Sequence, residues 1–383
     1  MGKGWVRLVG LLAGITVLTA TSSASAFTPA QEQRMQQIAE RYRAALDYPG
    51  LAIGVWQQGN GGFTTTVGAA NLRSGRPLEL SDHFHIGSVT KTMTATLALQ
   101  LVQRGKLKLH DSIDKYVKGV PLGRLITVRM LLNHTSGLRT GPGSQVGKKL
   151  RRNMRLDFTP DQLLRWSVRA PRYGFPGEVW GYSNTGFWLL GKIVRKLTHK
   201  PLPVLYRQRI FDRLGMSDSA FRPPRPVPKP AAHGYLGGPH GRPIDVTRMN
   251  WSWAWTAGAV TSTIRDLGRW APAVATGDGL LNAATQAKRL QCVPIGQTSG
   301  IFAGVRYCLG LFKWPLTSGK YIGHNGEGPG YDTESFYSPD SKVTIVAFGS
   351  TDTGDDPVKR SRLDDIGLNG IVPLLAAAVT GTG

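Results

Sequence analysis

The chain has 383 residues, of which 47 are Lys or Arg and 24 are Asp or Glu, so its formal net charge at pH 7 is +23. This length is sufficient to bury a large core, either as one domain or as two lobes. The positive surplus favours anionic partners, which include wall polymers, phospholipid head groups and nucleic acid. Because the sequence contains no recognisable nucleic-acid-binding motif, we expect no nucleic-acid partner.

The first 26 residues resemble a secretory signal peptide. Lys3 and Arg7 precede an apolar run over 8–20, and the small residues at 24–26 form a cleavage pattern. We therefore expect an exported protein, secreted or periplasmic, that comprises residues 27–383. The apolar run at 371–379 is shorter than the roughly 20 residues that a spanning helix needs, so we expect no transmembrane anchor.

The predicted elements begin with a helix over 31–46 and a hairpin of two strands over 51–56 and 63–67. From 90 to 214 the pattern is mainly helical, and residues 221–231 form a proline-rich connector. Later elements are expected in the C-terminal part, as strands over 307–314, 321–325, 334–337 and 343–350 and a helix over 360–379.

These elements predict an α+β fold in which an antiparallel sheet is flanked by terminal helices and a mostly helical lobe is inserted between its strands. The sheet-containing lobe should comprise about 27–88 and 240–383, and the helical lobe about 89–239.

Ser88 and Lys91 form a Ser-x-x-Lys motif where an apolar run passes into a helix. Positions i and i+3 share one helix face, so the hydroxyl and the amine would lie side by side. A serine hydroxyl needs a neighbouring base to become a nucleophile at neutral pH, and the helix N-terminus favours developing negative charge. The motif alone is weak, because chance produces about one such spacing in a chain of this length.

Two later stretches supply candidate partners. Tyr182 and Asn184 lie in a loop, rich in glycine, ahead of an apolar helix that begins near residue 187. By itself this pair could equally be a core tyrosine and a helix cap. His324 begins an edge-like strand that runs into glycines, which would allow a ligand close to the backbone.

Taken in order, these elements resemble the penicillin-recognising serine hydrolases, which include class C β-lactamases, D-alanyl-D-alanine carboxypeptidases, esterases and D-aminopeptidases. The family's three motifs correspond to Ser88 to Lys91, Tyr182 to Asn184 and His324 to Gly326. Further family-like segments lie at 131–138, 182–191, 213–216 and 257–263. The resemblance covers about residues 50–350 and implies a β-lactamase/transpeptidase-like fold.

The resemblance implies a role for each motif residue. Ser88 would be the nucleophile, with Lys91 and Tyr182 as the pair that handles its proton. Asn184 would orient the substrate amide, and the backbone N–H groups of Ser88 and Glu327 would form the oxyanion hole. Which member of the coupled Lys–Tyr pair holds the proton stays open at this point.

The third motif departs from the Lys-Thr-Gly of β-lactamases, because His324 replaces the lysine. We count His324 among the catalytic residues and take the departure to disfavour a dedicated β-lactamase. Strand alternation puts His324 and Gly326 on one face and Asn325 and Glu327 on the other. We count Asn325, Gly326 and Glu327 as substrate-binding residues and expect the substrate to meet Asn325 and Glu327.

Glu327 bears on the choice of substrate. A carboxylate about 6 Å from the C-terminal carboxylate of a D-Ala-D-Ala peptide would be repelled by about 3 kcal/mol, which favours ester, amide or amine-bearing substrates. Alternatively, Glu327 turns away and pairs with a nearby Arg or Lys, as a chain this basic allows.

Cys292 and Cys308, the only cysteines, are expected to form a disulfide after export. The histidines lack metal-ligand spacing, so we expect neither a metal nor a cofactor. Three alternating tryptophans over 251–255 would place their rings on one face, as core packing or, less simply, as a substrate wall.

We predict an exported serine hydrolase that acts on a small peptide, ester or amide, or on cell-wall peptidoglycan, through a Ser88 acyl-enzyme. A D-alanyl-D-alanine carboxypeptidase-like peptidase is the first choice, and a carboxylesterase or D-aminopeptidase is the second. A non-catalytic wall-binding protein of the same fold is a third hypothesis. The oligomeric state is not indicated by the sequence.

Overall fold

A computed structural model describes residue 1 and residues 27–141, 143–237, 242–296, 303–351 and 370–381. The predicted signal peptide, apart from residue 1, and the first part of the predicted helix over 360–379 lie outside these residues. In the described part of the chain, no helix combines the length and apolar character needed to cross a bilayer.

The centre of the fold is an antiparallel sheet of nine strands in the order β3-β2-β1-β14-β13-β12-β11-β10-β9. The strands are β1 Gly50–Gln57, β2 Gly61–Asn71, β3 Arg76–Pro77, β9 Val293–Pro294, β10 Arg306–Tyr307, β11 Phe312–Leu316, β12 Gly319–Gly328, β13 Tyr331–Ser338 and β14 Val343–Gly349. Because β1 pairs with β14, the two ends of the chain meet in the middle of the sheet.

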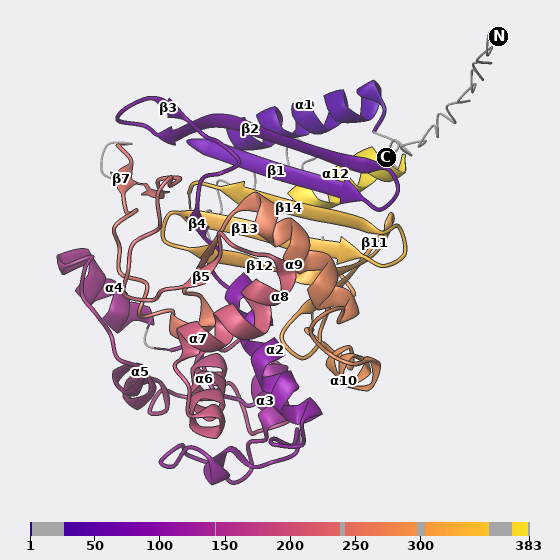
Figure 1. Cartoon of the computed structure of the whole chain (residues 1–383). Helices are drawn as coiled ribbons and strands as arrows, with labels where there is room; N and C mark the ends of the chain where they lie inside the picture. The colour runs from indigo at the N-terminus through magenta and orange to yellow at the C-terminus, as the bar shows by residue number, and fades with distance from the viewer. Residues whose placement is uncertain (2–26, 142, 238–241, 297–302, 352–369, 382–383) are drawn as a thin grey trace.

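Helices cover both faces of this sheet. On one face, α1 (Pro29–Ala45) and α12 (Ile371–Thr380) pack against each other and against β1, β2 and β14. The capping box of Thr28 and Gln31 starts α1 by satisfying free backbone N–H groups. On the other face, α9 (Ile264–Thr276) crosses β1, β12, β13 and β14. Figure 1 shows the sheet between these two helical layers.

The remaining helices gather on the α9 side of the sheet, in the lower part of Figure 1. The central one is α2 (Val89–Gln103), which is buried from Val89 through Leu101 and therefore forms the core of the helical part. The others are α3 Val128–Leu132, α4 Gly143–Arg152, α5 Pro160–Ser167, α6 Asn184–Thr198, α7 Leu202–Tyr206, α8 Asp212–Leu214 and α10 Ala283–Arg289, with short turns of helix at Ile113–Lys115, Arg207–Phe211 and Trp255–Ala257.

Two small sheets connect these parts. In the first, β4 (Phe84–His85), β8 (Val260–Ser262) and β5 (Ala220–Phe221) are ordered β4-β8-β5. In the second, β6 (Tyr235–Leu236) pairs with β7 (Ile244–Asp245). The three-stranded sheet lies immediately before α2 and fixes the point where that helix begins.

The predicted fold class is confirmed, including the hairpin of β1 and β2 and the terminal helices over the sheet. The strand predicted over 307–314 is wrong in detail. It is divided into β10 and β11 because the chain turns at 308–311, where Cys308 N–H donates to the Leu311 carbonyl and Gly310 has a φ of 85°. The helix α9 was not predicted, and the two-lobe boundaries stay a prediction.

The three tryptophans over 251–255 do not lie on a strand as predicted, because this segment is a turn followed by a short helix. The rings of Trp251 and Trp253 nevertheless lie 5.5 Å apart, centroid to centroid. Trp251 is fully buried, and its ring stacks on His85 with centroids 4.1 Å apart. This arrangement agrees with the packing role for Trp251.

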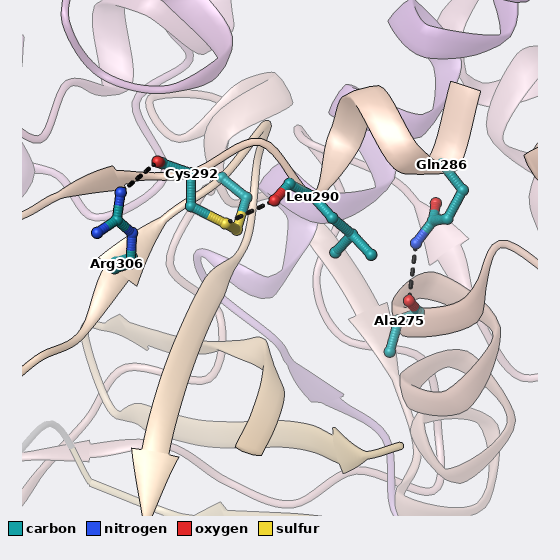
Figure 2. Close-up of a disulfide and its surroundings, with 6 residues drawn as sticks. Ala275, Gln286, Leu290, Cys292 and Arg306 are labelled. Atoms are coloured by element: carbon teal, nitrogen blue, oxygen red, sulfur yellow. Dashed lines mark hydrogen bonds between the residues drawn. A yellow bond between two sulfur atoms is a disulfide. The ribbon is translucent and has the colours of Figure 1, made fainter. Parts of the chain in front are cut away.

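The predicted disulfide joins Cys292, before β9, to Cys308, after β10 (Figure 2). Arg306 donates a 2.9 Å hydrogen bond to the Cys292 carbonyl next to this link. The bridge therefore fastens the last two strands at the edge of the large sheet.

Candidate active site

Ser88 lies at the N-terminus of α2, directly after β4. The preceding Gly87 has a φ of 47°, in the left-handed region that favours glycine. A Cβ atom there would lie 2.8 Å from the backbone nitrogen of Glu327 in β12. Glycine therefore allows the turn that carries Ser88 to approach the strand closely.

Lys91 lies one helical turn after Ser88, as the motif spacing predicts. Its Nζ is 2.8 Å from Ser88 Oγ and 2.9 Å from the Ala257 carbonyl oxygen. The side chain is completely buried, and burial lowers the pKa of the Lys91 amine well below its ordinary value. The shift favours the uncharged amine, and only that form can accept a proton.

Tyr182 approaches Ser88 from the loop before α6. Its hydroxyl forms a hydrogen bond with Ser88, and its ring centroid lies 4.8 Å from Lys91 Nζ. Burial raises the pKa of Tyr182 above its ordinary value, while the hydrogen bond with Ser88 opposes that shift. The neutral phenol is therefore the favoured form of Tyr182.

Asn184 is the first residue of α6, and Ser183 caps that helix by accepting a 3.3 Å hydrogen bond from Gly186 N–H. The Asn184 side-chain oxygen is buried and has no hydrogen-bond partner among the described residues. A buried amide with an unused acceptor can bind a substrate N–H group.

The strand β12 passes beside the nucleophile with His324 and Gly326 on the near face. A Cβ atom on Gly326 would lie 2.0 Å from the Ile86 carbonyl oxygen and 3.0 Å from Ser88 N. The His324 ring lies 6.2 Å from the Tyr182 ring, centroid to centroid. The structure thus brings the third motif to the first two.

The register of β12 and β13 shows which face of the sheet carries Asn325 and Glu327. Asn325 pairs with Glu334 and Glu327 pairs with Asp332 in the register of β12 and β13, and paired residues share a face. Asp332 accepts a hydrogen bond from Tyr48, which belongs to the core beneath α1 and α12. The side chains of Asn325 and Glu327 are therefore on the opposite face from Ser88, although the strand alternation itself is as expected.

His324 is held through both ring nitrogens. Nε2 lies 3.1 Å from the Tyr307 hydroxyl, and Nδ1 lies 2.5 Å from the Asn325 carbonyl oxygen. The side chain is buried, which lowers its pKa to about 3. His324 is accordingly neutral at physiological pH, unlike the lysine that β-lactamases carry there.

His134 is a site residue to which the sequence analysis assigns no separate role. Its Nδ1 accepts a 3.1 Å hydrogen bond from Ser183 N–H, and its ring lies 4.4 Å from the Tyr182 ring. It has a φ of 63° and is buried, and burial lowers its pKa. Its only signal was its place in the family-like segment 131–138.

Within the described residues, no group of three or more His, Cys, Asp or Glu side chains is arranged to hold a metal ion. The groups gathered around Ser88 are its own hydroxyl, the buried Lys91 amine, the Tyr182 phenol and backbone N–H groups.

Comparison with known proteins places these features in context. The Beta-lactamase family model matches residues 35–368. Penicillin-binding protein 4* of Bacillus subtilis is 27% identical over 300 residues, which are 73% of this chain and 63% of that protein. The D-alanyl-D-alanine-carboxypeptidase/endopeptidase AmpH of Escherichia coli is 27% identical over 290 residues, 73% of this chain and 72% of that protein.

Among solved structures, a D-stereospecific amidohydrolase from Streptomyces is similar, with a TM-score of 0.76 and 29% sequence identity. The match covers 88% of this chain and 99% of the amidohydrolase. Fold and motif order therefore agree with the sequence resemblance.

Proposed function

This chain belongs to the Beta-lactamase family, whose members are serine hydrolases, and we propose that it cleaves a peptide or amide bond after a D-residue through a Ser88 acyl-enzyme. The observation that carries the proposal is the double contact of the Ser88 hydroxyl, with the buried Lys91 amine and with the Tyr182 phenol. Each of these contacts offers a route for the proton that the serine must lose.

In the proposed acylation step, neutral Lys91 takes the Ser88 proton as Oγ forms a bond with the substrate carbonyl carbon. The bond from that carbon to the leaving nitrogen then breaks, and Tyr182 passes a proton to the departing amine while Lys91 restores it. In the second half of the reaction, a water molecule gives a proton to the Lys91–Tyr182 pair as its oxygen attacks the acyl-enzyme carbonyl carbon. The bond from that carbon to Ser88 Oγ then breaks, the pair returns the proton to Ser88, and the carboxylic acid is released. Positioned proton transfer of this kind is typically worth about 10²–10⁴-fold in rate.

The negative charge on the substrate oxygen would be stabilised by the backbone N–H groups of Ser88 and Glu327. The close approach of Gly87 and Gly326 supports this role, because it brings the two backbone segments together. Each such donor is typically worth about 10²–10³-fold in rate. Asn184 would bind the amide group of the acyl part.

The proposed substrate class is a peptide or amide with a D-residue on the acyl side. A D-alanyl-D-alanine carboxypeptidase-like activity is supported by the similarity to AmpH, and a D-amino amide hydrolase by the similarity to the Streptomyces amidohydrolase. Neutral His324 favours the second, because it offers no positive charge to a C-terminal carboxylate. Esterase activity stays a further alternative, and we propose export on the basis of residues 1–26.

Glu327 argues less strongly against a carboxypeptidase, because its side chain lies on the sheet face opposite Ser88, although its charge still helps to raise the pKa of Tyr182. We expect Glu327→Gln to lower the KM for a D-Ala-D-Ala peptide by much less than the roughly hundredfold that a separation of about 6 Å would give. A clear gain in binding would restore the repulsion argument.

The test is the intact mass of the mature protein after incubation with benzylpenicillin, beside Ser88→Ala. A one-to-one adduct on the wild type alone would identify Ser88 as the nucleophile, whereas an adduct on both proteins would contradict it. Turnover of D-alanyl-D-alanine peptides, of their C-terminal amides and of a nitrophenyl ester then distinguishes the substrate classes. Inertness to all of these would favour the non-catalytic wall-binding protein.

A further inference from the structure

A large groove lies in the helical part of the molecule, apart from the residues around Ser88. It has a volume of about 1080 Å³ and runs between α5, α6, the start of α7 and the segment that follows β5. This volume is slightly above the range of about 300–1,000 Å³ that is typical of small-molecule sites. None of its lining residues belongs to the three catalytic motifs.

Six cationic side chains line the groove, namely Lys192, Arg195, Lys196, Lys200, Arg222 and Arg225. Asp161 is the one carboxylate among the lining residues, and it is paired with Lys192. Arg195, Lys200 and Arg225 are exposed at the rim. So many like charges repel one another unless a negatively charged ligand lies between them.

The floor of the groove is apolar. Its accessible apolar lining consists of prolines, namely Pro160, Pro201, Pro203, Pro223 and Pro224, and the largely buried Leu202, Phe221 and Trp255 also line it. Trp255 has a φ of 38°, which is unusual for a bulky residue and is a feature that backbone at functional sites often shows. A purely polar polyanion would need only the cations. The apolar floor below them therefore indicates a ligand that also has an apolar part.

We propose that this groove binds a phosphate-bearing amphiphile, with its apolar part against the prolines of the groove and its phosphate on the cationic rim. Arginine presents a planar fork of donors that matches phosphate oxygens, and Arg222 and Arg225 provide two such groups on one segment. A phosphate monoester carries close to two negative charges at pH 7, which suits a rim with several cations. The shared chemistry fits both a membrane phospholipid and a free phosphorylated amphiphile.

The groove is linked to the catalytic residues through a short segment. The Ala257 carbonyl, which accepts the hydrogen bond from Lys91 Nζ, lies two residues after Trp255. None of the groove cations belongs to the three catalytic motifs, so substitutions among them should leave hydrolysis of a small ester unchanged. That hydrolysis is therefore a check that each variant is folded.

The test measures binding of decyl phosphate, below its critical micelle concentration, by calorimetry. Decyl maltoside supplies the same tail without the charge, and inorganic phosphate supplies the charge without the tail. The groove variant is Arg222→Glu with Arg225→Glu. Its matched control is Lys148→Glu with Arg152→Glu on α4, two exposed positions with the same change in net charge.

Decyl phosphate should bind the wild type at least about tenfold more tightly than either control ligand, and the groove variant should lose about tenfold in affinity for each arginine. The α4 variant should keep the wild-type affinity. If charge reversal prevents folding, a second pair of variants is used. The groove variant is then Arg195→Ala with Lys200→Ala, and its α4 control is Lys149→Ala with Arg151→Ala. Equal losses in groove and α4 variants, or binding of inorganic phosphate alone, would overturn the proposal.

Vesicles distinguish the two sources of the ligand. If the wild type sediments with phosphatidylglycerol vesicles and the groove variant does not, the phosphate belongs to a bilayer lipid. If decyl phosphate binds but the vesicles do not retain the protein, the ligand is a free amphiphile. Either result supports the groove as the binding site.

Discussion

The Tyr307 hydroxyl lies 3.1 Å from His324 Nε2, on the opposite side of the ring from the Asn325 carbonyl that contacts Nδ1. A carbonyl only accepts, so Nδ1 carries the proton and Nε2 accepts from the tyrosine. The third motif consequently holds a neutral ring beside Tyr182. The buried histidines have consequences for stability that can be measured.

His85 and His324 should make stability depend on pH. Burial lowers the pKa of each to about 3 from an ordinary value of 6.5. Below pH 6.5 the unfolded chain binds protons that the folded chain refuses, so stability is complete above that pH and falls as the pH decreases toward 3. The free energy of unfolding should drop by about 1.4 kcal/mol per histidine between pH 7.5 and 5.5.

Urea unfolding at both pH values measures this drop in the wild type and in His85→Phe. Phenylalanine keeps a ring against Trp251, which stacks on His85 with an interplanar angle of 13°. In the variant, the difference in the free energy of unfolding between pH 7.5 and pH 5.5 should be about 1.4 kcal/mol smaller than in the wild type. An unchanged difference would mean that His85 does not contribute.

His134 should act as a positioning residue for Tyr182. It accepts the hydrogen bond from Ser183 N–H and packs on the Tyr182 ring, so its loss should displace the phenol from Ser88. We expect His134→Asn to lower kcat by about 10–100-fold, because misplaced catalytic groups lose much of their effect, and to change KM little. Asparagine tolerates the left-handed backbone.

A matched control exists for His134. His199 also has a left-handed backbone, with a φ of 53°, but it is exposed at the end of α6. His199→Asn should keep wild-type kcat and KM for a nitrophenyl ester. If both variants lose kcat equally, or if only the thermal stability of His134→Asn changes, the positioning role is wrong.

The sequence was most informative where geometry is local. The spacing of Ser88 and Lys91 predicted their contact because three residues make about one helical turn. Strand alternation likewise separated His324 from Asn325. It could not reveal which face meets Ser88, because that depends on the packing of α2 and α9 against one side of the sheet and α1 and α12 against the other.

Long-range contacts account for the residues that were missed. Nothing next to His134 in the sequence indicates Ser183, which lies 49 positions away and meets it only in the folded chain. The tryptophans over 251–255 were misplaced for a related reason, since an alternating pattern describes a strand and this segment is a turn and short helix.

The disulfide should stabilise the folded chain without being needed for catalysis. Cys292 and Cys308 are 16 positions apart, and closing such a loop is worth about 3 kcal/mol. We expect Cys292→Ala with Cys308→Ala to lower the free energy of urea unfolding by about that amount. A reducing agent should bring the wild type to the same midpoint and leave the variant unchanged. Equal midpoints for wild type and variant in the absence of reductant would contradict the estimate.

Gly326→Ala should remove activity by separating β12 from the nucleophile. The new Cβ would lie 2.0 Å from the Ile86 carbonyl oxygen. Because the clash is with backbone and not with a flexible side chain, the strand must move away from Ser88. Because Glu327 N–H would then leave the oxyanion position, kcat for a nitrophenyl ester should fall at least about 100-fold. Gly147→Ala in α4 is the control, since the nearest atom to its new Cβ is a guanidinium nitrogen of Arg151 at 3.5 Å. Full activity in Gly326→Ala would show that β12 supplies no donor to the reaction.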